Sequence, residues 1–545
     1  MRVFKIVVPL FVAIGSVAVA QTAKQPETGT HAPFGRVLVR TVPMPNGTIL
    51  RSATYTPSGK VLVSYAKSAG QASRDLDLAV MDDDGSHFRP IWSGSLPERP
   101  KDNGIRDMVF PDNKRVFLGD FILECEGSLD TCTAPRVLPV EYPAEVDSGP
   151  HIMNRWSEMI VAPDNRHIGW DTLLAGGSGV VVFTGELQRT SDRYRIVQPE
   201  IVSTLEPFRP DPKHPDGVIV APMRGGEIKQ FVHGGTAISL VGAVRRDIPD
   251  SVVQDLASGR VEAITDAPGY DETTIFSPDE RLGLTMTTRF SPKTDPAILG
   301  LMPRPYAASL NMGLSMFAYV YAVTGVREER PGNVGPALID IHASKTQRGY
   351  LGENLNRDPD WVFFSPMSWH PSGQKGMWIE GHRGDHAKRI RVVTLPDYHP
   401  GPRVPTRPTP ATVPYGSSDL SWVAKLATAG TVDVKVYGHA SGFIRYRRTG
   451  PTIEKTYSDF SDDGRAVYSG RETTTVNPAG NSVYNADLRL AGPKAGVMAM
   501  QVTFGPLGGP RPAALSFAPD ASGQPATRGY AQYNGLRLEA SALVP

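Results

Sequence analysis

A proline-centred turn recurs along this chain, and this recurrence constrains the fold more than any other feature. The copies are TYTPSGKVLVSY (54–65), VFPDNKRVFLGD (109–120), IVAPDNRHIGWD (160–171), TIFSPDERLGLTM (274–286) and SWHPSGQKGMWI (368–379). Proline fixes φ at the first corner of a turn, Asp or Ser bonds its own backbone, and Gly, Asn or Glu completes the reversal. Short apolar runs flank each turn, so each copy predicts a β-hairpin.

The spacing of these turns predicts an architecture. The turn prolines Pro57, Pro111, Pro163, Pro278 and Pro371 are 54, 52, 115 and 93 residues apart. A weaker copy without proline, FVHGGTAISLVG (231–242), falls inside the third interval. Periods of this size, with several β runs in each, are typical of propeller blades. We therefore predict an all-β fold with a six-bladed β-propeller. Seven blades are the fallback, because 300–345 has room for one more. The alternative is a set of unrelated hairpins in a sandwich.

The start of the chain is typical of a secretory leader. Its first twenty residues, MRVFKIVVPLFVAIGSVAVA, place Arg2 and Lys5 before an apolar stretch that ends in a small-residue cleavage pattern. This pattern predicts a signal peptide over 1–20 and a secreted or periplasmic protein, and the alternative is an uncleaved anchor. No later segment reaches the roughly 20 apolar residues of a membrane span, so we expect none.

A change in composition divides the remainder of the chain. The stretch HPGPRVPTRPTPATVPYG is rich in proline and predicts a stiff, extended linker over 399–417. The linker follows a propeller domain over 35–398. Beyond it, 418–545 contains alternating runs joined by Gly, Asp and Asn turns, a pattern that predicts a β-sandwich module.

Charge and cysteine content indicate which partners the chain can bind and whether its cysteines are oxidised. The chain has 57 basic and 56 acidic residues, with no basic stripe, so we expect no nucleic-acid partner. Cys125 and Cys132 are the two cysteines, and they share a Gly- and Ser-containing loop. Because export would place them in an oxidising compartment, we predict a disulfide. A metal pair is the alternative, although no further Cys or His lies at ligand spacing beside them.

Several catalytic signatures are absent from the sequence. It has no Gly-x-Ser-x-Gly elbow, no phosphate loop and no dinucleotide glycine fingerprint. His382 and His386 are four apart, but they lie in a Gly-rich turn after a predicted strand rather than on a helix. We therefore expect neither a metal site nor a cofactor.

Carboxylates that precede the turns are the best catalytic candidates from the residues alone. Glu158 lies five residues before Pro163, and Glu272 lies six before Pro278. The innermost strand of each blade borders the central funnel, so such residues can point into it. Glycoside cleavage needs two carboxyl groups across the scissile bond. The alternative is that both acids are solvated rim residues, since Asp and Glu are commonly exposed.

Ordered motifs over roughly 100–473 carry a resemblance to a known family. They are KRVFLGDFILEC with a second cysteine, SEMIVAPDNRHIGWD, TDAPGYDETTIFSPDERLGLTMTTR, the stretches ALID, RGYLGENLN and DPDW, and YSDFSDDGRAVYSGRET. In this order they resemble the saponin hydrolase family, secreted enzymes that remove glucuronic acid from triterpenoid saponins. The chain departs from the family pattern at Glu272, where the family has Asp, at Glu353, where it has Gln, and in its smaller number of cysteines.

The resemblance implies an exported glycoside hydrolase whose partner is a small-molecule glycoside, such as a glucuronide. Glu158 and Glu272 would be the acid–base pair, and Arg289 would bind the uronate carboxylate through its guanidinium fork. Tyr350 and Trp361 would form a stacking wall, and Asp340 would bind sugar hydroxyls.

Two other functions stay open, as does the oligomeric state. One is a non-enzymatic periplasmic propeller that binds a protein or glycan partner, because fold alone does not imply function. The other is a metal-dependent uronate lyase, which would need a His cluster that the sequence does not show.

Overall fold

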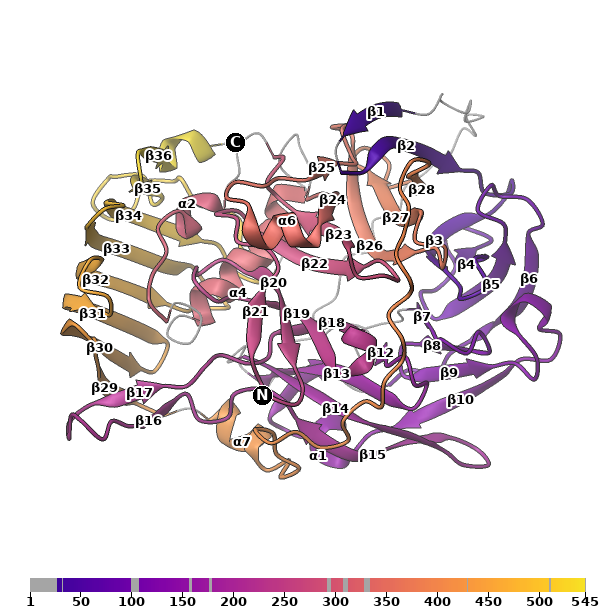
Figure 1. The fold of residues 1–545 in the computed structure, drawn as a ribbon, viewed down its shortest axis with the longest axis horizontal. Coiled ribbons are helices and arrows are strands. Elements are labelled where there is room, and N and C mark those ends of the chain that lie inside the picture. The colour runs from indigo at the N-terminus through magenta and orange to yellow at the C-terminus, as the bar shows by residue number, and fades with distance from the viewer. Residues whose placement is uncertain are drawn as a thin grey trace.

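The structure is a computed structural model that describes residues 27–31, 33–99, 107–155, 159–175, 179–291, 296–306, 312–327, 334–428, 430–508 and 511–544. Antiparallel sheets surround a central axis, and a large separate sheet lies to one side of them (Figure 1). The predicted signal peptide, 1–20, lies outside the described residues. Among the residues described, no helix is long and apolar enough to cross a membrane.

The first sheet shows the repeating unit, an inner strand followed by three strands in sequence order. It consists of β3 (Ile49–Tyr55), β4 (Val61–Ala66), β5 (Asp75–Met81) and β6 (Arg89–Ser95). The turn at Pro57 joins the inner strand to the second one. Its backbone bonds run from the Thr56 amide to the Lys60 carbonyl at 2.8 Å and from the Gly59 amide to the Thr56 carbonyl at 2.9 Å.

The next two units merge into one nine-stranded sheet, because β10 and β15 pair in parallel. The strands of one unit are β7 (Asp107–Val109), β8 (Arg115–Leu118), β9 (Phe121–Glu124) and β10 (Arg136–Glu141). The strands of the other are β11 (Ile152–Arg155), β12 (Ile160–Val161), β13 (His167–Leu174), β14 (Val180–Arg189) and β15 (Tyr194–Ile201). The short helices η1 (Leu129–Thr131) and α1 (Ala144–Asp147) lie in their loops.

Two four-stranded sheets continue the ring. The first contains β18 (Glu227–Val232), β19 (Ala237–Gly242), β20 (Asp250–Asp255) and β21 (Val261–Ala263), with η3 (His233–Gly235) as its inner turn. The second contains β22 (Asp271–Phe276), β23 (Leu282–Thr287), β24 (Ala337–Asp340) and β25 (Glu353–Asn354). Helix α6 (Ile341–Thr346) follows β24, and the hairpin of β16 (Phe208–Pro210) and β17 (Val218–Val220) precedes β18.

The last sheet closes the ring with strands from both ends of the propeller. It contains β26 (Trp361–Trp369), β27 (Lys375–His382) and β28 (Lys388–Thr394), and β2 (Gly35–Val42) pairs antiparallel with β28, with β1 (Glu27–His31) beyond it. The inner strands β3, β7, β12, β18, β22 and β26 each contact the next, and β26 contacts β3. The predicted β-propeller is therefore confirmed. The number of blades depends on how the nine-stranded sheet is divided, so six stays a prediction.

The proline-rich segment 399–417 is a strap across the turn end of the propeller (Figure 1, orange). The Gly401 amide donates to Asp279 Oδ2 at 2.8 Å, the Val404 amide to the Pro278 carbonyl at 2.9 Å, and the Arg407 amide to the Gly234 carbonyl at 2.9 Å. A Cβ on Gly234 would lie 2.2 Å from the Pro405 carbonyl oxygen. The strap therefore explains why this one turn copy carries glycine in place of proline.

The C-terminal module is one eight-stranded antiparallel sheet in sequence order. Its strands are β29 (Val432–Tyr437), β30 (Ser441–Thr449), β31 (Thr452–Ser461), β32 (Val467–Thr475), β33 (Ser482–Ala491), β34 (Gly496–Phe504), β35 (Arg528–Tyr533) and β36 (Leu536–Glu539), with α7 (Trp422–Ala427) before and η5 (Ala540–Leu543) after them. This differs from the expected sandwich, because the layer that faces the sheet is helical rather than a second sheet.

That helical layer comes from the propeller, between β23 and β24. It consists of α2 (Ala297–Gly300), α4 (Met312–Val320) and the π-helix η4 (Tyr321–Val326). Phe317 and Tyr321 pack against Phe504 with ring centroids 5.7 and 6.3 Å apart. Within the described part of 300–345 the chain is thus mainly helical, and β24 belongs to the sheet of β22, so the extra blade considered for this region does not form there.

Candidate active site

Glu272 is a buried carboxylate on the inner strand β22, and both of its oxygens have partners. Lys229 Nζ on β18 donates to Oε1 at 3.0 Å, and the Tyr270 hydroxyl donates to Oε2 at 2.6 Å. The residue is 6% exposed. Burial alone would raise the pKa of Glu272, but the charge of Lys229 and the two hydrogen bonds outweigh it, and the pKa lies below the usual value. Glu272 is therefore held in its ionised form.

Lys229 links Glu272 to a second carboxylate. Its Nζ lies 2.8 Å from Glu227 Oε1, and both Lys229 and Glu227 are buried. Neither Lys229 nor Glu227 was a candidate from the sequence, although both lie ahead of the proline-free turn copy as Glu272 lies ahead of Pro278. The common position before an inner turn was the signal that could have found them.

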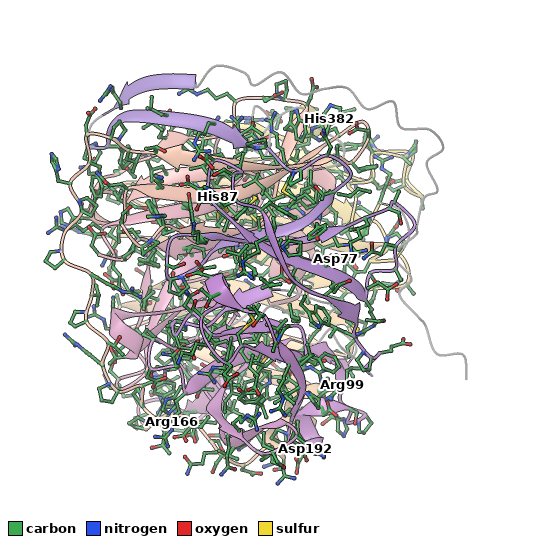
Figure 2. The ribbon with its side chains drawn as sticks, turned by 90° about the vertical axis from the view of Figure 1, so that its right-hand side faces the viewer. Asp77, His87, Arg99, Arg166, Asp192 and His382 are labelled. Atoms are coloured by element: carbon green, nitrogen blue, oxygen red, sulfur yellow. A yellow bond between two sulfur atoms is a disulfide. The ribbon has the colours of Figure 1, made fainter. Side chains whose placement is uncertain are left out.

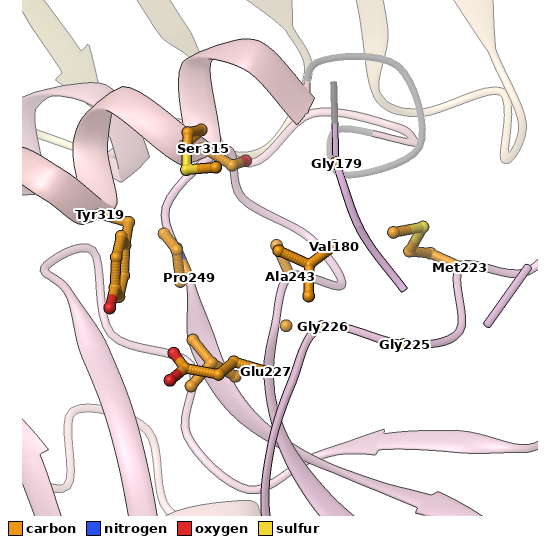
Figure 3. Close-up of a pocket in the computed structure, with 13 residues that line it drawn as sticks. Gly179, Val180, Met223, Gly225, Gly226, Glu227, Ala243, Pro249, Ser315 and Tyr319 are labelled. Carbon is orange, nitrogen blue, oxygen red and sulfur yellow. The ribbon is translucent and has the colours of Figure 1, made fainter. Parts of the chain in front are cut away.

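A pocket has Glu227 at one end (Figure 3). Helix α4 forms one side, and the loop that leads into β18 forms the other, with a cavity volume of about 100 Å³. The described residues that line it are Gly179, Val180, Met223, Gly225, Gly226, Glu227, Val241, Gly242, Ala243, Pro249, Ser315, Met316 and Tyr319. Most of these residues are apolar or present only backbone.

An aromatic contact joins this pocket to Glu272. Tyr319 lines the pocket, and its ring meets the Tyr270 ring edge-on at 5.9 Å between centroids. Tyr270 in turn donates its hydroxyl hydrogen to Glu272. Glu272 is therefore connected to the pocket by two routes, through Lys229 to Glu227 and through Tyr270 to Tyr319.

Arg289 contacts Asp271, the residue that precedes Glu272 on β22, and none of its hydrogen bonds is to Glu272. It forms an ion pair with Asp271, and both side chains are buried. Its Nε donates to Thr287 Oγ1 at 3.0 Å, and its Nη1 donates to the Tyr350 carbonyl at 3.2 Å. The register of β22 with β23 is irregular between Asp271 and Thr274, where Glu272 lies. All of its nitrogens are already bonded within the chain.

Asp340, Tyr350 and Trp361 also have structural partners. Asp340 caps α6, accepting from the Ala343 amide at 2.7 Å, and its own amide donates to the Tyr350 hydroxyl oxygen at 2.9 Å. The Trp361 ring lies under the Arg389 guanidinium at 3.9 Å. The structure thus joins Arg289 to Tyr350 and Tyr350 to Asp340, but none of these contacts reaches Glu272. Glu158, the other proposed catalytic acid, lies outside the described residues.

A second cavity, of about 280 Å³, occupies the turn end of the central channel. Its lining includes turn residues of every inner strand, the strap residues Arg403, Val404 and Thr406, and the channel residues Asp107 and Lys229. Asp107 is 7% exposed, and burial raises its pKa to about 6 against the opposing effects of a hydrogen bond with Ser52 and the charge of Lys388. The channel therefore contains a carboxyl group that takes up a proton far more readily than Glu272.

Cys125 and Cys132 form the predicted disulfide, with Cα atoms 5.6 Å apart. His382 lies near the top of the side view in Figure 2, and its Nδ1 pairs with Asp385 at 2.8 Å. In the part of the chain that the structure describes, no three His, Cys, Asp or Glu residues are grouped so that they could hold a metal ion.

No protein-family model matches the chain, and no curated protein matches it. Among solved structures, TolB from Acinetobacter baumannii is 12% identical over 64% of this chain and 64% of its own, with a TM-score of 0.27. An oligogalacturonate lyase in complex with manganese is 10% identical over 69% of this chain and 98% of its own, with a TM-score of 0.32. The β-propeller domain of the Trilobed protease from Pyrococcus furiosus is 8% identical over 75% and 95%, with a TM-score of 0.27.

These similarities are too low to carry an argument about activity. The assignment as a propeller rests on the order and closure of the sheets described above. The comparisons do not support the resemblance to the saponin hydrolase family, so what that resemblance implies stays a proposal.

Proposed function

We propose that the chain is an exported glycoside hydrolase in which Glu272 is the ionised carboxylate beside the sugar. The observation that carries the proposal is the hydrogen bonding of Glu272. Lys229 and Tyr270 hold it ionised on an inner strand, and Tyr270 and Tyr319 connect it to an apolar pocket. A retaining glycosidase needs such a group as nucleophile, and an inverting one needs it as base. Glu158 is the proposed proton donor, and glucuronic acid is the proposed sugar. The leader-like first twenty residues support export.

Arg289 has a different role in this proposal from the one that the sequence suggested. Its bonds to Asp271, Thr287 and the Tyr350 carbonyl fix the geometry of β22 and of the loop before β25. To bind a sugar carboxylate it would have to exchange one of these partners. We assign it a positioning role.

The test is turnover of aryl and methyl glycosides by the full chain, with glucuronides included. Glu272→Gln keeps the shape and removes the charge, so we expect kcat to fall by about 10²–10⁴-fold. Glu158→Gln should give a loss of similar size. The matched control is Glu539→Gln, because Glu539 is an exposed glutamate that also pairs with a basic residue, Arg537, at 2.6 Å. Near-normal turnover by Glu272→Gln would remove Glu272 from the mechanism.

Binding without chemistry is the second candidate, and one observation favours it. Both oxygens of Glu272 and every nitrogen of Arg289 are bonded within the chain, as in structural ion pairs. If the wild-type chain binds a glycoside in a calorimeter but cleaves none of the panel, this second function replaces the first.

A further inference from the structure

The pocket beside Glu227 is small, and its size limits what it can bind. Its volume is about 100 Å³. Cavities of roughly 150 Å³ bind benzene, whereas pockets for whole drug-sized molecules measure about 300–1,000 Å³. A single six-membered ring is therefore the largest group that the pocket can hold, and a polycyclic skeleton does not fit.

The lining favours an aromatic ring over an aliphatic one. Tyr319 presents an aromatic face, and the thioethers of Met223 and Met316 also line the pocket. Aromatic rings pack favourably against other rings and against sulfur. Figure 3 shows Tyr319 on α4 at one side of the pocket and Met223 at the other, with Pro249, Ala243 and Val180 between them, so a bound ring would lie among these side chains.

Glycine backbone keeps another wall flat. Gly226 has φ +136°, and a Cβ there would lie 1.8 Å from the Val241 carbonyl oxygen. Gly225 has φ +94°, and a Cβ would meet Ser203 Oγ at 2.4 Å. The close approach of the loop to β19 thus requires glycine, and the bare backbone that results suits a planar ligand.

The described lining of the pocket is almost entirely apolar, and its one charged residue sets the orientation of the ring. Among the lining residues that the structure describes, Glu227 is the one with a charge, and Lys229 connects it to Glu272. A ring in the pocket therefore has its polar substituent directed toward Glu227, on the side of Glu272.

From these features we propose that the pocket binds the aryl group of the substrate, so that the enzyme acts on glycosides of single-ring phenols. This inference rests on the proposed function for the reaction itself. The sugar lies outside the pocket, because the pocket holds only one ring.

The experiment separates ring binding from catalysis. Binding of phenol and of cyclohexanol to the full chain is measured by ligand-observed NMR, and kinetics are compared for 4-nitrophenyl and methyl glycosides. Ala243→Phe fills the pocket, and Val244→Phe is the matched control because Val244 is 40% exposed and does not line it. We expect phenol to bind at least tenfold more tightly than cyclohexanol. Ala243→Phe should weaken phenol binding at least tenfold and raise KM for the aryl glycoside alone, and Val244→Phe should change neither.

Each other outcome has one meaning. Phenol binding that Ala243→Phe abolishes, without turnover of any glycoside, supports the ring site and overturns the hydrolase. If Ala243→Phe changes the turnover of aryl and methyl glycosides equally, the proposed ring site is wrong and the proposed hydrolase activity is unaffected. Turnover without any phenol binding leads to the same conclusion. If Ala243→Phe does not fold, Met223→Ala is tested instead, because it enlarges the pocket. The affinity for 2-naphthol relative to phenol should then rise above that of the wild type, and an unchanged ratio would overturn the inference.

Discussion

At the scale of single residues, two carboxyl groups near the channel are shifted in opposite directions. Lys229 and Tyr270 keep the pKa of Glu272 low, whereas Asp107 has its pKa raised to about 6 because burial outweighs Ser52 and Lys388. The sequence identified Glu272 from its place before a turn, but it could not identify Lys229 or Tyr319 as neighbours. Those contacts join different sheets and a helix, so they depend on the closed ring rather than on local pattern.

The raised pKa of Asp107 predicts a pH-dependent gain of stability in Asp107→Asn. The folded protein holds this proton up to about pH 6, and the unfolded chain releases it near pH 3.8, so Asp107 costs stability as the pH rises between them. Two pKa units correspond to about 3 kcal/mol. Asp107→Asn should therefore be more stable than the wild type at pH 8 and equal to it near pH 4, as measured by urea unfolding.

Asp192→Asn is the control, because Arg193 lowers the pKa of Asp192 to about 2 and no gain is expected. A gain of the same size at both pH values would show that charge is not the cause.

At the scale of elements, the turns were predictable and the helices were not. Pro57, Pro111, Pro163, Pro278 and Pro371 each lie between an inner strand and the next strand, since proline fixes the backbone locally. The hydrophobic residues of 311–323 give no clear strand or helix period, because they face both the propeller and the C-terminal sheet. The missing proline in the fourth unit also has a cause outside its own hairpin, in the passage of the strap.

The glycine loop before β18 gives a prediction at this scale. Gly226→Ala places a Cβ against the Val241 carbonyl and forces alanine to φ +136°, so we expect a loss of about 2–4 kcal/mol in the free energy of unfolding. Gly179→Ala is the control, because it lines the same pocket and a Cβ there meets nothing within 4 Å. Equal stability of the two variants in urea would contradict the close packing of loop and strand.

At the scale of the whole molecule, a buried cluster of charges fastens the C-terminal sheet to the propeller. Arg304 pairs with Asp247 and lies 3.4 Å from Glu472 on β32, and Lys455 on β31 lies 2.7 Å from Glu472. All four side chains are at most 1% exposed. Composition and periodicity predicted a separate β module after the linker, but they could not show that its inner face would carry charges paired with the propeller.

Removal of one member of this cluster should lower the free energy of unfolding. Arg304→Met leaves buried carboxylates with fewer positive partners, and we expect a loss of about 3–5 kcal/mol. In calorimetry, the unfolding of the C-terminal sheet should then occur at a lower temperature than that of the propeller. Arg537→Met, which breaks the exposed pair with Glu539, should change stability by less than about 1 kcal/mol. A single unshifted transition for Arg304→Met would show that the cluster does not hold the two parts together.

The pairing of β2 with β28 also determines when the ring can close during synthesis of the chain. β2 leaves the ribosome early, but its partner strand follows about 350 residues later. At about 5–20 residues per second, this delay is roughly 20–70 s. During that interval the edge of β2 that will pair with β28 has no partner, and an unpaired edge is a template for other chains. The newborn chain therefore has its greatest exposure to aggregation before its last propeller strand is made, and that exposure ends when Lys388–Thr394 emerges and the ring closes.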